Sequence, residues 1–122
     1  MKRVKSGSNA VPVILAAVLI AVIFSSAFAK LVDVKKIPNG KKNSCANCHL
    51  PGSDKSSDKL TPFGNDYRAN GKKWDAVLAK KDSDGDGMTN GQELCDPDGA
   101  WKKDDSNPDG TVFNPGDPAS HK

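Results

Sequence analysis

The chain has 122 residues, which is enough for one small domain beside a targeting segment. Its formal net charge is +3, from 18 Lys and Arg against 15 Asp and Glu. Residues 1–29 hold three of the basic residues, Lys2, Arg3 and Lys5, and no acidic residue, so residues 30–122 are formally neutral. This balance excludes the strongly basic surface typical of nucleic-acid-binding proteins, and we expect no nucleic-acid partner.

The N-terminal segment has the three parts of a secretory signal peptide. Its basic start is followed by the apolar run Val13–Phe24 and then by Ala27-Phe28-Ala29, a pattern that signal peptidase accepts. The apolar run is shorter than the roughly 20 residues that a spanning helix needs. We therefore expect residues 1–29 to be cleaved and residues 30–122 to be exported, to the periplasm or outside the cell. An uncleaved anchor is the alternative, and only in that case would the chain be attached to a membrane.

The exported part begins with a basic, turn-rich lead-in over residues 30–44, whose clearest turn is Pro38-Asn39-Gly40. Large apolar side chains are few in residues 30–122. A domain of this size is marginally stable even with a good core, so it needs a further staple: a cofactor, a metal ion or a disulfide.

The motif Cys45-Ala46-Asn47-Cys48-His49 follows the lead-in and has the C-x-x-C-H pattern of c-type haem attachment. Two thiols at this spacing can bond to the vinyl groups on one porphyrin edge, and His49 then supplies the proximal iron ligand. The pattern and the export segment together predict one covalent heme c at Cys45, Cys48 and His49. The alternatives are a disulfide between one of these cysteines and Cys95, or a zinc site completed by Cys95 or His121.

Two short helices are predicted after a polar loop over residues 52–59. Thr61 and Pro62 form a helix start, and Asn70-Gly71 ends that helix. A second helix is predicted over residues 72–81, because Trp74, Val77 and Leu78 recur at helical spacing.

Residues 82–93 then fit the twelve-residue EF-hand loop pattern. Oxygen ligands at these spacings favour calcium over zinc or iron. Since no second loop is present, we expect a structural calcium ion, not a regulatory sensor. The expected ligands are Asp82, Asp84, Asp86, the backbone carbonyl of Met88, Asn90 and a bidentate Glu93.

A short helical turn is predicted over residues 90–95 and an irregular tail over residues 96–122. The second axial ligand of the predicted haem iron would be Met88, His121 or no protein side chain. Coordination by His121 of a neighbouring molecule's haem would link subunits, and Cys95 would be either a buried small hydrophobe or an intermolecular bridge. Self-association is therefore possible by either route.

Several motifs in a fixed order resemble the temptin-type secreted domain family. They are Pro62-Phe63-Gly64-Asn65-Asp66-Tyr67, then Trp74, then the acidic loop, then Asp96-Pro97-Asp98-Gly99-Ala100-Trp101-Lys102. The resemblance covers most of residues 37–116 and implies an extracellular, calcium-stabilised module that contains cysteines and is usually described by a disulfide. The C-x-x-C-H motif departs from this pattern and resembles a bacterial branch that looks like a monohaem cytochrome c.

The predicted fold is therefore a small, mostly α and irregular single domain, organised by one covalent haem and a structural calcium loop. The predicted function is that of an exported monohaem c-type cytochrome that transfers electrons to a redox partner protein or a neighbouring cytochrome. The alternative is a secreted calcium-binding interaction or signalling module, stabilised by a disulfide and without haem. We do not expect an enzyme, because the sequence shows no set of nucleophile, base and orienting residue.

Overall fold

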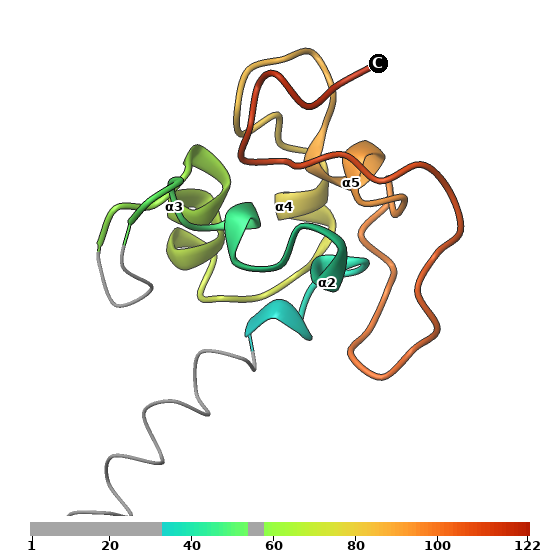
Figure 1. The fold of residues 1–122 in the computed structure, drawn as a ribbon. Coiled ribbons are helices and arrows are strands. Elements are labelled where there is room, and N and C mark those ends of the chain that lie inside the picture. Colours follow the sequence, from blue (N-terminus) through green and yellow to red (C-terminus); the bar gives the residue numbers. More distant parts are fainter. Residues whose placement is uncertain (1–32, 54–57) are drawn as a thin grey trace, which may run out of the picture. The chain divides into compact units, whose positions relative to one another are not determined.

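A computed structural model describes residues 33–53 and 58–122 of the chain (Figure 1). These residues form a small domain of short helices and irregular segments, with no strand among them. The signal peptide predicted for residues 1–29 lies outside the described residues. Within the described part, no helix is both long and apolar enough to cross a membrane.

The lead-in folds into helix α2 (Gly40–Asn43) and the 3-10 helix η1 (Ser44–Asn47), which carries the first cysteine of the C-x-x-C-H motif. Asn39 precedes α2 in the left-handed region, with φ at 54°. Its side-chain amide donates to the carbonyl oxygens of Leu94 and Pro108, at 3.0 and 2.9 Å. The predicted turn at Pro38-Asn39-Gly40 therefore also ties the lead-in to the second half of the chain.

Helix α3 (Pro62–Ala69) begins and ends where the sequence predicts. The Thr61 side chain accepts a hydrogen bond from the backbone N–H of Gly64, and Pro62 occupies the first turn, where its missing N–H costs nothing. The same hydroxyl donates to the carbonyl oxygen of Asn47 at 2.6 Å. One threonine thus caps α3 and attaches it to the cysteine motif.

Helix α4 (Ala76–Ala79) is shorter than the helix predicted over residues 72–81. Lys72 has a φ of 56°, which is incompatible with a helix beginning there. The Asp75 carboxylate caps the later start by accepting from the N–H groups of Val77 and Leu78. Val77, predicted to face the core, is 64% exposed.

Helix α5 (Asn90–Glu93) has a capping box formed by Thr89 and Gln92. Its C-cap is Leu94, and the next residue, Cys95, has a φ of 65°, which is unusual for a residue other than glycine. Residues 96–122 contain no helix or strand, in agreement with the predicted irregular tail.

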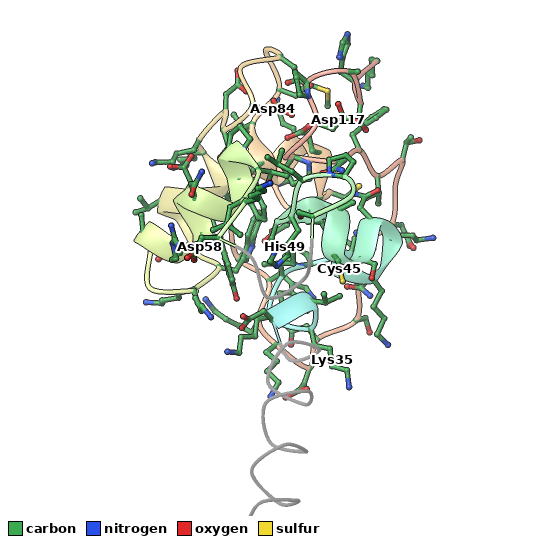
Figure 2. The ribbon with its side chains drawn as sticks, turned by 60° about the vertical axis from the view of Figure 1, so that its left-hand side comes forward. Lys35, Cys45, His49, Asp58, Asp84 and Asp117 are labelled. Atoms are coloured by element: carbon green, nitrogen blue, oxygen red, sulfur yellow. The ribbon has the colours of Figure 1, made fainter. Side chains whose placement is uncertain are left out.

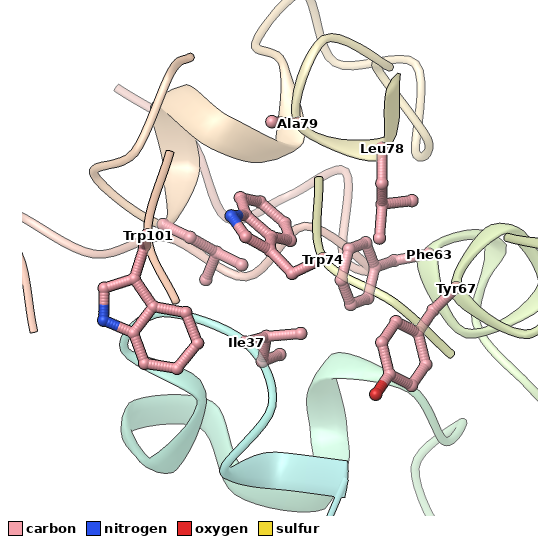
Figure 3. Packing of buried hydrophobic residues seen from close by; sticks show 8 residues of the cluster. Ile37, Phe63, Tyr67, Trp74, Leu78, Ala79 and Trp101 are labelled. Atoms are coloured by element: carbon pink, nitrogen blue, oxygen red, sulfur yellow. The ribbon is translucent and has the colours of Figure 1, made fainter. Parts of the chain in front are cut away.

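The core is a single cluster of buried side chains drawn from most of the described domain (Figure 3). Phe63 stacks on Tyr67 with ring centroids 6.2 Å apart. The buried carboxylate of Asp96 accepts from the indole N–H of Trp74 at 2.7 Å and from the backbone N–H of Trp101 at 3.0 Å. The members of the cluster are Ile37, Phe63, Tyr67, Trp74, Leu78, Ala79, Leu94 and Trp101.

We predict that Asp96→Ala lowers the free energy of unfolding by about 1–3 kcal/mol, because the substitution leaves the buried Trp74 indole N–H without an acceptor. Urea unfolding followed by tryptophan fluorescence measures this change. The exposed Asp98, two residues away, provides the control, and Asp98→Ala should change the stability by less than about 0.5 kcal/mol. Equal effects of the two substitutions would contradict the role given to Asp96.

Candidate functional site

The acidic loop is shaped by its own aspartates, each of which accepts backbone hydrogen bonds. The two carboxylate oxygens of Asp82 accept from the N–H groups of Gly85 and Gly87, at 2.8 and 3.0 Å. Gly87 has a φ of 93°, which glycine adopts at no steric cost. Asp84 accepts from the N–H of Asp86 at 3.3 Å, and Asp86 accepts from the N–H of Met88 at 2.8 Å. These turns bring the three aspartates together.

The remaining carboxylate oxygens of the loop are buried and have no hydrogen-bond partner. They are Asp84 Oδ2, Asp86 Oδ2 and both oxygens of Glu93. Glu93 is fully buried. One ligand oxygen from each of Asp82, Asp84 and Asp86 lies within 4.8 Å of the others, and no other group of three potential ligand residues among the described residues meets this criterion. The arrangement can hold a hard cation with oxygen ligands.

The pKa values of Glu93 and Asp84 are raised because these carboxylates are buried and lie close to other acidic groups. Burial, followed by the charges of Asp84, Asp86 and Asp82, raises the pKa of Glu93 to about 8. Burial is also the largest cause of the rise in the pKa of Asp84 to about 6. A divalent cation would reverse both shifts by favouring the charged carboxylates.

Asn90, an expected cation ligand, has a side chain engaged elsewhere. Its amide nitrogen donates to the carbonyl oxygen of Leu78 at 2.8 Å and to Ser83 Oγ at 2.9 Å. Its amide oxygen accepts from the N–H of Ser83 at 3.4 Å. Of the expected cation ligands, the structure brings the carboxylates of Asp82, Asp84 and Asp86 together, while the Asn90 side chain connects the loop to α4.

Met88 and His121, the candidate axial ligands of a haem, both lie at the acidic loop. They line one hollow of about 540 Å³ together with Asp86 and Phe113. His121 Nδ1 lies 2.7 Å from the carbonyl oxygen of Pro118 and 3.8 Å from Asp86 Oδ2. The C-terminal tail thus returns to the acidic loop.

The cysteine motif lies elsewhere in the domain, and Figure 2 shows Cys45 and His49 well separated from Asp84. The side chain of Cys48 packs against the hydrophobic core, and burial is the largest cause that raises the pKa of its thiol to about 12. Its carbonyl oxygen accepts from the N–H of Thr61 at 2.9 Å. A Cβ added to Gly64 would lie 2.2 Å from that oxygen, so the motif lies directly against α3.

All three cysteines are free thiols in the structure. Cys95 is partly buried, and its thiol donates to the carbonyl oxygen of Thr111 at 3.4 Å. Cys45, Cys48 and His49 form no group of three metal ligands together with Cys95 or His121. The zinc alternative therefore has no ligand set among the described residues.

The sequence gives no indication of the role of Phe113. Its N–H donates to the carbonyl oxygen of Glu93 at 2.9 Å, and its carbonyl accepts from the side-chain amide of Asn43 at 3.0 Å. Backbone pairing of this kind leaves no residue pattern outside a regular helix or strand. Only the Asn114-Pro115-Gly116 turn beside Phe113 marks the segment as ordered.

Comparison with known proteins yields one family match. The family model described as Temptin C-terminal matches residues 27–117. A 44-residue stretch is 52% identical to Temptin from Aplysia californica and covers 36% of this chain. That stretch spans only 35% of the Aplysia protein, so most of the relative's length has no counterpart in the alignment. No solved structure matches the chain.

The family match contradicts the prediction of heme c at Cys45, Cys48 and His49, because no haem is known in that family. The cytochrome and electron-transfer predictions are therefore wrong. In the structure the Cys48 side chain is partly buried against the core, and its backbone lies against α3. Met88 and His121 lie at the other site, so neither has an axial role.

We predict that the cation-free protein loses stability as the pH rises from about 4.5 to about 8. Glu93 has its ordinary pKa of 4.5 in the unfolded chain and about 8 in the folded one, so across this range the folded state binds more protons. At about 1.4 kcal/mol per pKa unit the loss has an upper bound of about 5 kcal/mol. Thermal melts in chelator at a series of pH values measure it. Glu93→Gln should flatten the profile, and an unchanged slope in that variant would contradict the assignment to Glu93.

Proposed function

Because the chain belongs to the Temptin C-terminal family, we propose that it is an exported interaction or signalling module whose fold is stabilised by a calcium ion. The resemblance implies an extracellular protein, and the N-terminal sequence has the layout of an export signal. The family match gives no specific support to a periplasmic location. The proposed activity is binding to a partner, without catalysis.

The observation that carries the calcium proposal is the burial of Glu93 with both carboxylate oxygens unpartnered. A buried carboxylate without a partner is costly, and here Asp84 and Asp86 add like charge beside it. A cation enclosed by these oxygens would remove both costs. Calcium accepts six to eight oxygen ligands in flexible geometry, which suits a cluster of aspartates with a bidentate glutamate and a carbonyl.

The surroundings of the loop favour a structural ion over a regulatory one. Helix α5, which follows the loop, has only four residues, and Leu94 behind it is fully buried in the core. The left-handed turn at Cys95 then ends the helix. A sensor opens by moving a long exit helix and exposing an apolar groove, whereas this exit helix is a single turn fixed to the core.

We also propose that calcium supplies the additional stabilisation that a domain with so small a hydrophobic core needs. The three cysteines are free thiols, so the proposed stabilisation does not depend on a disulfide. Calcium concentrations outside cells are high enough to keep even a weak site filled.

We predict that calcium raises the melting temperature of the exported domain. A ligand that binds only the folded state stabilises it by about 4.1 kcal/mol when its concentration is 1,000 times Kd. Glu93→Gln and Asp82→Ala should remove most of this effect, because each deletes a ligand of the ion. Differential scanning calorimetry with calcium and with chelator measures the shift, and titration calorimetry gives Kd.

The matched control is Asp109→Asn, which changes the charge by the same amount at an exposed position outside the loop. This variant should keep the full calcium-dependent rise in melting temperature. A parent protein whose melting temperature is the same in calcium and in chelator would overturn the proposed calcium site.

A further inference from the structure

One short segment of the tail, residues 113–116, contacts both the acidic loop and the cysteine motif; we call it the bridging segment. Phe113 joins the two with its backbone alone. Its N–H donates to the carbonyl oxygen of Glu93 at 2.9 Å, and its carbonyl accepts from Asn43 Nδ2 at 3.0 Å. Phe113 alone therefore connects Glu93, which closes the proposed calcium site, to Asn43, the last residue of α2.

Asn43 also contacts the cysteine motif directly. The same amide nitrogen donates to Asn47 Oδ1 at 3.2 Å. Asn47 lies between the two cysteines and is 1% exposed. Its own amide donates to the carbonyl oxygens of Gly40 and Ser44, at 2.9 and 3.0 Å. The Asn47 side chain thus stabilises η1, and Asn43 connects Asn47 to the bridging segment.

The rest of the bridging segment covers the same part of the motif. Asn114 Nδ2 donates to the carbonyl oxygen of Ala46 at 3.1 Å, and the side chain of Pro115 is fully buried. A Cβ on Gly116 would lie 2.5 Å from the carbonyl oxygen of Asn47. This close approach means that the segment has to move before the cysteine motif can leave the core.

Cys48 is the group whose access depends on such a movement. Its side chain is partly buried and packs against the buried cluster, so opening of the motif would expose the thiol more fully to a reagent or a thiol-exchanging protein. Opening would lift residues 113–116 and would break the hydrogen bond between Phe113 and Glu93. A change at that hydrogen bond would alter the position of the glutamate that closes the acidic loop.

We propose that cation occupancy of the acidic loop controls chemical access to the Cys48 thiol through the bridging segment. The inference rests on the proposed calcium site. With the ion bound, the closed arrangement is stabilised and the thiol is protected; without it, the motif opens more often and the thiol reacts. Because such coupling is reciprocal, modification of Cys48 weakens calcium binding by the same factor.

The test measures the alkylation rate of Cys48 by iodoacetamide in the full exported domain, with mass spectrometry as the readout. The parent for this test carries Cys45→Ser and Cys95→Ser, so that only Cys48 reacts. If opening requires loss of the ion, calcium at 100 times its Kd slows the alkylation that takes place through the open state by about 100-fold. Asn43→Ala should abolish this slowing while the variant still binds calcium.

The matched control is Asn70→Ala, which removes an asparagine with two hydrogen bonds outside the bridge, to Lys73 O and Asp75 Oδ1. This variant should keep the calcium-dependent protection of Cys48. If Asn43→Ala does not fold, Asn114→Ala tests the same bridge through the contact with Ala46. Protection that persists in every bridge variant would show general stabilisation of the fold and would overturn the inference.

Titration calorimetry on the same samples separates the two proposals. Calcium binding without any change in the alkylation rate of the parent overturns the coupling and leaves the calcium site intact. Absence of calcium binding overturns the calcium site and the coupling with it.

Discussion

The structure depends on one electrostatic constraint, the burial of Glu93 among the aspartates of the acidic loop. Three carboxylates, those of Asp84, Asp86 and Glu93, turn oxygens inward that no protein donor reaches. Burial and the neighbouring aspartates raise the pKa of Glu93, so the charged carboxylate is unfavourable here without a cation. A bound divalent ion would remove this cost by favouring the charged carboxylates.

Beside the hydrophobic core, side-chain amides connect distant segments of the fold, because the described residues form no sheet that would pair their backbones. Buried asparagines donate to distant carbonyl groups: Asn39 to Leu94 and Pro108, and Asn90 to Leu78. Buried carbonyl groups need such partners wherever regular structure does not supply them. These bonds connect segments far apart in sequence, so a change at the acidic loop reaches the lead-in through few intermediates. The proposed coupling to Cys48 uses this property.

The cysteine motif shows the limit of a short pattern as evidence for function. The spacing in Cys45-Ala46-Asn47-Cys48-His49 is chemically right for haem, and the predicted signal peptide favours the same interpretation. In the structure Cys48 is partly buried against the core, and the bridging segment contacts the motif at Ala46. The family match then assigns the chain to proteins without a known haem.

The sequence alone determines those features that depend on residues within about four positions of each other. The Thr61 cap, the start of α3 at Pro62 and the spacing of carboxylates in the acidic loop are of this kind, since capping and loop ligation are local. Tertiary contacts decide the rest. They place Phe113 on Glu93, and they turn the Asn90 amide away from the loop towards Leu78. These positions follow from pairing between segments distant in sequence, which no local pattern records.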